Sequence, residues 1–384
     1  MINKRTVCNL FLLGFLFLVF IRPINAVVKN ANSFFSSDYW ESYEYLKRTY
    51  YSSQYVNKNK PNIMPDQAFE AFLGGAFAKG ENPILFVHEH PPLGRYIIGF
   101  SIILFKNSTT ILLPLMFFSL LGIFLISRLV IQNTFLSLVP LAIFLNEPLF
   151  ISKFEIAPLI EPIQLTFIIF SLYFFIKGAT GKKYAQYFIL SSIMLGFVIS
   201  IRFFILGGAL AFAMILYFIF KKKIDKRFVI FLFSLPLSLV VLAASYTKTI
   251  QEGYSVFQIF GIQKYIFFYH KSKLSSIFSF WDLIMFNRWH TWWADKRIIT
   301  DSQWIPIWPI SMTLTFLHVL LSLIKKLKLT DPEKIVLFWI FSYSALLSVG
   351  YSTTRYFLPL LPFLYIMGVS FLLKIYRLKV KKYI

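Results

Sequence analysis

The chain has 384 residues, of which 57% are hydrophobic and only 15% are charged. Soluble proteins carry about 25% charged residues, so this composition excludes an ordinary soluble domain. The formal net charge of +22 does not indicate a nucleic-acid partner, because the lysines cluster in short hydrophilic pieces between apolar runs, as in membrane proteins. A single cysteine, Cys8, excludes a disulfide framework and a multi-cysteine metal site.

Residues 1–26 have Lys4 and Arg5 before a long apolar stretch and end in Ile-Asn-Ala. A cleaved signal peptide has a shorter apolar stretch and a small residue three positions before its cleavage site. We therefore favour an uncleaved first membrane helix. Both alternatives place the residues that follow on the outer face.

Eleven apolar runs predict an all-α, polytopic membrane protein with about 10–11 transmembrane helices. The runs are 8–25, 93–105, 109–127, 134–150, 158–176, 185–201, 203–220, 228–248, 305–324, 335–352 and 356–373. The run at 93–105 is too short to cross the hydrocarbon and carries Arg95, so we interpret it as an interfacial segment.

Ten spans place every basic piece on the cytoplasmic side, as the positive-inside rule requires. These pieces are 177–183, 221–227, 325–334 and 374–382. Two long hydrophilic stretches, 27–108 and 249–304, then share the outer face. Because no internal repeat or low-complexity linker divides the chain, we expect a single membrane domain over residues 1–384.

The first outer loop is expected to contain amphipathic helices at the membrane surface, one within 37–51 and one within 63–80. Pro65 and Asp66 form a helix-start signal for the second helix. Backbone N–H groups and the helix dipole would stabilise the Asp66 carboxylate there. Taken alone, Asp66 is most simply a helix cap.

The stretch "ILFVHEHPPLGRY" at 84–96 brings His88, Glu89 and His90 next to two prolines. Adjacent side chains diverge in extended backbone, and no second cluster supplies further ligands, so we expect no metal here. Pro91 and Pro92 force the chain before them out of the helical region, which predicts a turn.

Together, these segments resemble the first external loop of the protein O-mannosyltransferases and related GT-C glycosyltransferases that use polyprenyl-phosphate sugars. The matching motifs are Asp-Gln-Ala-Phe-Glu-Ala-Phe from Asp66 and Glu-His-Pro-Pro-Leu-Gly-Arg-Tyr from Glu89, with 22 residues between Asp66 and Glu89. Segments 154–167, 300–310 and 355–366 extend the resemblance over most of the chain.

The chain also departs from the family pattern. Gln67 stands where the family usually has Glu, Arg95 where it has Lys, and Glu161 where Asp is commoner. Residues 249–304 contain no soluble β-trefoil-like insert, so the chain does not resemble the long eukaryotic members.

The resemblance implies an inverting transfer of a sugar, mannose in the closest family, from a polyprenyl or dolichyl phosphate. The acceptor would be a hydroxyl of a protein, lipid or glycan on the outer or luminal face, and no cofactor is implied. Asp66 matches the catalytic base. The expected substrate contacts are Glu89, His90, Arg95, Glu161, Arg202, Arg355 and Trp304.

Simpler roles remain open for several of these residues. Arg202 and Arg355 adjoin apolar spans, where they either bind phosphate or extend to the membrane surface. Glu161 fits a sugar contact or a structural salt bridge equally well. Six of the eight tryptophans, Trp304 among them, lie within 281–308, where an interfacial aromatic belt is an alternative to sugar stacking.

The competing function is a transporter or flippase for a lipid-linked sugar. Transporters usually have repeat-related halves, broken helices or ionisable residues at mid-membrane depth. In this sequence no repeat is visible and the ionisable residues gather at one face, which favours the enzyme.

Overall fold

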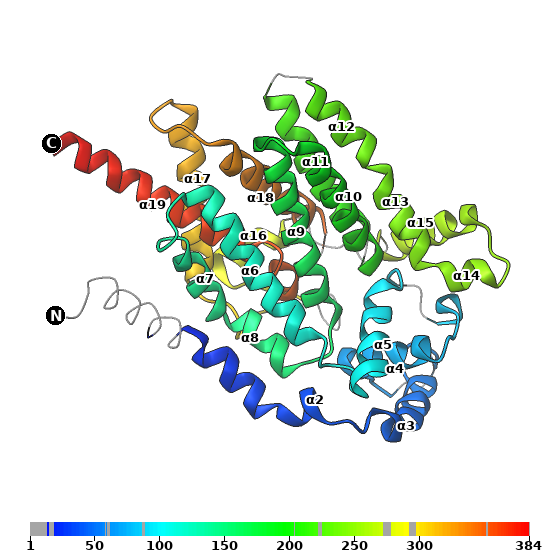
Figure 1. The fold of residues 1–384 in the computed structure, drawn as a ribbon. Helices are drawn as coiled ribbons and strands as arrows, with labels where there is room; N and C mark the ends of the chain where they lie inside the picture. The colour runs from blue at the N-terminus through cyan, green and yellow to red at the C-terminus, as the bar shows by residue number, and fades with distance from the viewer. Residues whose placement is uncertain are drawn as a thin grey trace, which may run out of the picture.

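The computed structural model describes most of the chain and shows it to be almost entirely helical (Figure 1). The described residues are 14, 19–57, 59, 62–86, 89–202, 204–221, 225–271, 278–291, 297–350 and 352–383. Most of the predicted first membrane helix lies outside them, and residues 19–29 are helical.

Within the described residues, six helical segments are long and apolar enough to cross a membrane. They are α6 (Leu112–Ile131), α9 (Ile160–Thr180), α10 (Tyr184–Ile201), α12 with α13 (Lys226–Ser234 and Pro236–Ser245), α18 (Asp331–Val349) and α19 (Leu361–Tyr383). Four shorter apolar helices accompany them: α5 (Leu93–Phe105), α11 (Phe204–Phe220), α15 (Val256–Lys271) and α17 (Ile307–Leu323). The prediction of a multi-pass, all-α membrane protein is confirmed.

The predicted span at 134–150 is wrong as a single helix. The structure forms α7 (Leu138–Leu145) and α8 (Pro148–Glu155), with Glu147 extended between them. Pro148 disfavours the helical region for the residue before it, so a new helix starts at the proline. The buried Glu147 carboxylate accepts hydrogen bonds from Trp308 and Tyr365, which holds this break inside the bundle.

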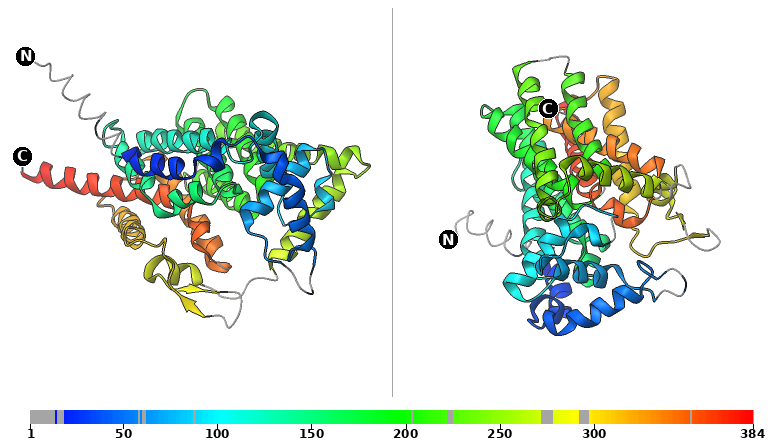
Figure 2. Two further views of the ribbon diagram at one scale, coloured as in Figure 1. Left: turned by 90° about the horizontal axis from the view of Figure 1, so that it is seen from below. Right: turned by 90° about the vertical axis from the view of Figure 1, so that its right-hand side faces the viewer.

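The first outer loop folds into a helical layer at the side of the bundle (Figures 1 and 2). Its elements are α2 (Ala31–Phe35), α3 (Tyr39–Ser52), α4 (Asp66–Ala78), the short 3-10 helix η1 (Pro83–Leu85) and α5. α3 is amphipathic as predicted, with Tyr39, Tyr43 and Tyr50 buried. By contrast, α4 presents no polar face to solvent along most of its length, because every residue from Phe69 to Phe77 is buried between its neighbours.

Two glycines allow α4 and α5 to approach closely. A Cβ atom added at Gly99 would lie 2.7 Å from the carbonyl oxygen of Gly74, and one added at Gly74 would lie 2.5 Å from the Ile98 side chain. α5 has the same bounds as the run interpreted as an interfacial segment, and it packs along α4.

The second outer stretch contains α14 (Thr247–Gln251), α15, α16 (Ser279–Phe286) and a small hairpin. The hairpin pairs β1 (Trp289–His290) with β2 (Ile298–Ile299) in antiparallel register, Trp289 opposite Ile299. Asp301, just after β2, accepts a 2.7 Å hydrogen bond from Thr354, at the start of the 3-10 helix η2 (Thr354–Phe357). This contact fixes the stretch against the segment that carries Arg355.

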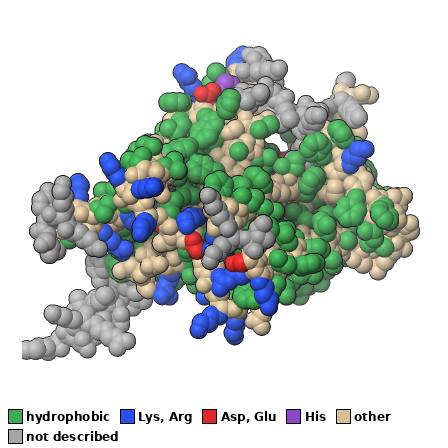
Figure 3. All heavy atoms as spheres, turned by 90° about the horizontal axis from the view of Figure 1, so that it is seen from above, with side chains coloured by type: hydrophobic (Ala, Val, Ile, Leu, Met, Phe, Trp, Pro, Cys, Tyr) green, Lys and Arg blue, Asp and Glu red, His purple; other side chains and the backbone are tan. Residues whose placement is uncertain are grey.

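All four basic pieces meet at one end of the bundle. Arg227 donates to the carbonyl of Ala179 at 2.6 Å, Lys221 lies 3.8 Å from Asp331, and Lys374 donates to the carbonyl of Lys328 at 2.6 Å. Viewed from this end, the surface gathers lysine and arginine side chains around a few acidic ones (Figure 3). The prediction that these four basic pieces lie on the same side of the membrane therefore agrees with the structure.

The close contact between α4 and α5 makes a testable prediction. Gly99→Val should lower the free energy of unfolding by about 1–3 kcal/mol, because its side chain would displace the backbone of α4. Gly208→Val on α11 is the matched control, since a Cβ there meets nothing within 4 Å. Thermal unfolding in detergent micelles measures both. Equal unfolding temperatures would contradict the proposed packing constraint.

Candidate active site

Four of the residues predicted from the sequence converge in one cluster. An Arg355 guanidinium nitrogen donates to Asp66 at 2.7 Å and lies 3.8 Å from Glu161. Arg202 approaches the same Glu161 oxygen at 3.2 Å. The cluster joins residues 289 positions apart in the chain, so only the complete bundle assembles it.

Helix ends place these charges. Asp66 is the first residue of α4 and Glu161 lies in the first turn of α9, where the positive ends of the helix dipoles favour carboxylates. Arg202 follows the last turn of α10, where a cation is favoured. The helix-cap interpretation of Asp66 does not hold, because Pro65 occupies the cap position and the carboxylate contacts Arg355 instead.

The cluster has a buried back and an open front. The side chains of Glu161 and Arg202 are 7% and 11% exposed, whereas those of Asp66 and Arg355 are 51% and 39% exposed. Both guanidinium groups lie over the Tyr356 ring, 4.9 Å away for Arg202 and 5.5 Å for Arg355. A substrate can therefore reach Asp66 and Arg355 while the pair behind them stays fixed.

The sequence analysis missed a fifth member, Lys153 on α8. Its side chain is buried, and its electrostatic neighbours include Glu161, Arg355, Arg202 and Asp66. The short segment around it reads as an outer turn between two apolar runs. Its burial depends on the break at Glu147, which the sequence did not reveal.

A second ion pair lies next to the cluster. Arg95 on α5 and Glu70 on α4 are both buried, with 2.9 Å between the guanidinium Nε and the carboxylate. Arg95 also lies over the Phe69 ring at 5.1 Å. Glu70 was missed as a site residue, although its position four residues after Asp66 puts it on the same helix face.

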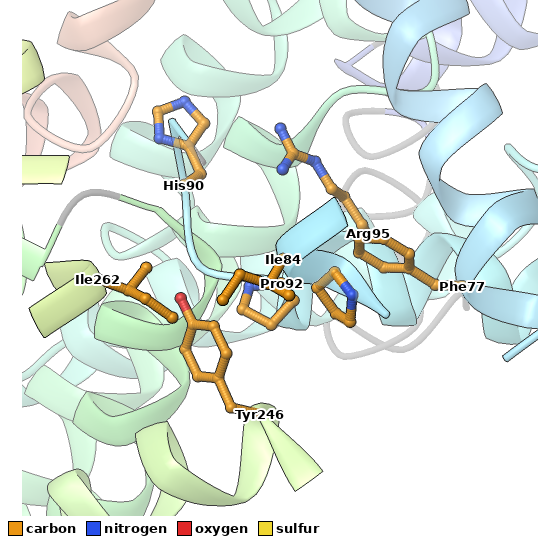
Figure 4. Close-up of a pocket in the computed structure, with 8 residues that line it drawn as sticks. Phe77, Ile84, His90, Pro92, Arg95, Tyr246 and Ile262 are labelled. Carbon is orange, nitrogen blue, oxygen red and sulfur yellow. The ribbon is translucent and has the colours of Figure 1, made fainter. Parts of the chain in front are cut away.

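His90 and Arg95 line a small pocket beside this ion pair (Figure 4). They extend to the same side of it, and the Tyr246 hydroxyl points toward them from the opposite wall. The remaining lining residues are apolar: Phe77, Pro83, Ile84, Pro92 and Ile262. The structure thus joins His90 and Arg95 across the predicted turn.

Glu89 and Trp304 occupy different surroundings. Glu89 lies within electrostatic range of the Tyr55 hydroxyl, as do Asp66 and Glu70, so it borders the charged region. Trp304 anchors the loop before α17, since its indole N–H donates to the carbonyl of Ile284 at 3.0 Å. Among the described residues, the structure does not bring Trp304 into the charged cluster.

The described part of the chain contains no group of three or more His, Cys, Asp or Glu side chains placed to hold a metal ion. His88, part of the stretch considered for metal binding, lies outside the described residues.

The buried Glu70–Arg95 pair predicts a stability effect. Arg95→Leu should destabilise the protein by about 3–5 kcal/mol, because it leaves a buried carboxylate without its partner. Adding Glu70→Gln should recover at least half of that loss, which a double-mutant cycle in detergent would measure. Additive losses from the two changes would show that the pair is not coupled.

The same pair predicts a pH dependence. Burial raises the pKa of the Glu70 carboxyl, and Arg95 opposes this rise. Without Arg95 the folded-state pKa rises further above the unfolded value, so the folded state gains relative stability as the pH falls. The deficit of Arg95→Leu should shrink between pH 7 and pH 5, measured by thermal unfolding. The prediction would be contradicted if the stability loss of Arg95→Leu were the same at pH 7 and pH 5. It would also be contradicted if that loss equalled the loss of the Arg95→Leu, Glu70→Gln double variant at both pH values.

Comparisons with known proteins agree with the geometry. The family model of dolichyl-phosphate-mannose-protein mannosyltransferase matches residues 89–247. Two solved structures of ArnT from Cupriavidus metallidurans are similar to this chain. The one bound to undecaprenyl phosphate has a TM-score of 0.60 at 13% sequence identity, and the one in the apo state has a TM-score of 0.59 at 15% identity. No curated protein matches the chain.

The structural similarity covers 80% of this chain and 56% and 55% of the two ArnT chains, so about half of ArnT has a counterpart here. At these identities the similarity concerns the fold. The resemblance stated from the sequence motifs is confirmed by the family match and by this fold. Residues 89–247 match the mannosyltransferase family model, and 80% of the chain has a helical fold similar to that of ArnT.

Proposed function

We propose that the chain is an inverting membrane glycosyltransferase that moves a sugar from a polyprenyl phosphate carrier to an acceptor hydroxyl. The observation that carries the proposal is the convergence of Asp66, Glu161, Arg202 and Arg355 at one edge of the bundle. This arrangement combines a carboxylate open to substrate with fixed positive charges beside it. The family match supports a lipid-phosphate donor.

Asp66 acts as the general base in this proposal. Its exposed carboxylate accepts the proton of the acceptor hydroxyl as the hydroxyl oxygen attacks the anomeric carbon. Arg355 donates to Asp66 in the free protein, which orients the carboxylate. Attack on the face opposite the phosphate inverts the anomeric configuration.

Arg202 and Arg355 stabilise the departing phosphate. Charge develops on the phosphate oxygens as the bond to the sugar breaks, and arginine supplies fixed donors suited to that charge. Glu161 holds both guanidinium groups by its buried carboxylate, so little reorganisation is needed during the reaction. His90 and Arg95 are proposed to contact the donor from the adjoining pocket.

The charge distribution supports an outer or luminal active site. Glu161 begins α9, whose last turn carries Lys177, and Arg202 follows α10, which starts after Lys183. The 18 residues of α10 span about 27 Å at about 1.5 Å per residue, close to the membrane thickness. With the basic end in the cytoplasm, the cluster faces the other side.

Asp66→Asn should lower kcat for sugar transfer by about 10²- to 10⁴-fold, because the amide cannot accept the proton. Asp38→Asn is the matched control, since Asp38 is an exposed acid at the start of α3 in the same outer loop. The measurement is transfer from undecaprenyl- or dolichyl-phosphate mannose by purified protein. Peptide, lipid and glycan acceptors are offered separately, which tests both the sugar and the acceptor.

If Asp66→Asn transferred sugar as fast as the native protein, Asp66 would not be the general base. A reconstituted native protein that moved the lipid-linked sugar across the bilayer without transferring it would favour the flippase.

A further inference from the structure

Lys153 is a buried cation close to the charged cluster. Its side chain is 5% exposed, although lysine is among the residues least often buried. Within the part of the chain that the structure describes, its ammonium group has no hydrogen bond or ion pair. An ammonium group withdrawn from water is costly unless an anion compensates it, so the position calls for an explanation.

The surroundings of Lys153 increase that cost. Glu161 attracts the ammonium, but Arg355 and Arg202 lie close enough to repel it. Glu161 is already shared between the two arginines, at 3.2 Å and 3.8 Å. Burial is the largest of the effects that lower the pKa of Lys153. A structural lysine would be expected to have a carboxylate of its own.

Counting charges shows what the cluster lacks. Lys153, Arg202 and Arg355 carry three positive charges, whereas Asp66 and Glu161 carry two negative ones. The neighbouring Glu70–Arg95 pair contributes no net charge. Among the five residues of the cluster, which Glu89 borders without joining, one positive charge is therefore left over beside the open front. A single anionic charge, such as that of a phosphodiester, would neutralise it.

We propose that Lys153 is a third ligand of the donor phosphate, together with Arg202 and Arg355. This inference rests on the proposed glycosyl transfer. The phosphate of a sugar-bearing lipid would enter between Lys153 and the exposed Arg355, replacing the missing partner of the ammonium. Lysine serves here as a compact point charge, whereas the two arginines supply directional donors.

The transfer step keeps the charges of this site in balance. The acceptor oxygen bonds to the anomeric carbon, its proton passes to Asp66, and the carbon–oxygen bond to phosphate breaks with its electron pair left on the phosphate. Asp66 loses one negative charge as the phosphate gains one. The three cations thus face three negative charges both before and after the step. Lys153 supplies the third of the positive charges.

The test compares Lys153→Met with native protein, because methionine is of similar length and carries no charge. Purified full-length protein is titrated with undecaprenyl phosphate and, separately, with undecaprenol, which lacks the phosphate. Lys153→Met should weaken binding of the phosphate about tenfold or more and leave undecaprenol binding unchanged. Lys248→Met is the control, since Lys248 on α14 is ion-paired with Glu252 at 3.2 Å, away from the cluster.

Thermal unfolding separates this role from a structural one. Replacing a buried charge by an apolar side chain of similar size is often neutral or stabilising, so Lys153→Met should unfold at the same or a higher temperature. Lys153→Arg should retain part of the preference for the phosphate. If Lys153→Met instead unfolded earlier and bound undecaprenyl phosphate normally, Lys153 would serve only to neutralise Glu161.

The two proposals can fail separately. Selective, Lys153-dependent binding of undecaprenyl phosphate by native protein that transfers no sugar would support the phosphate site and reject the glycosyltransferase. Sugar transfer and phosphate binding that are unchanged in Lys153→Met would support the enzyme and reject the role of Lys153.

Discussion

The buried Glu161 carboxylate holds the candidate site together. It is almost fully withdrawn from water, and such a charge persists only when cations compensate it. Its two guanidinium partners come from the end of α10 and from η2, and Arg355 extends the network to Asp66 on α4. One buried acid thus links α9, the end of α10, η2 and, through Arg355, the first outer loop.

This network explains how a reactive carboxylate can be both exposed and positioned. Asp66 sits on α4, whose other residues are packed between α3 and α5 with glycines at the closest approach. The helix therefore has little freedom, although its first residue reaches the surface. A site carried by a rigid, buried helix is more precisely placed than one carried by a loop.

The sequence reveals charged residues that are energetically costly because they adjoin apolar membrane spans. It does not reveal residues whose burial depends on partners far along the chain. Arg202 and Arg355 were conspicuous because they adjoin apolar runs, and the length of 93–105 matched α5 from end to end. In the sequence, Lys153 is indistinguishable from an ordinary lysine in a turn between two apolar runs. Its burial requires the helix break at Glu147, whose carboxylate binds Trp308 and Tyr365, 161 and 218 residues further along the chain. No local pattern encodes contacts at that range.

The residues of the cluster that lie inside the family match are also the buried ones, and those outside it are the exposed ones. Glu161, Arg202 and Lys153 lie inside the matched region 89–247 and form the buried back. Asp66 and Arg355 lie outside it and form the open front. The matched region therefore contains the buried charges of the cluster, and the two exposed charges come from segments before and after it.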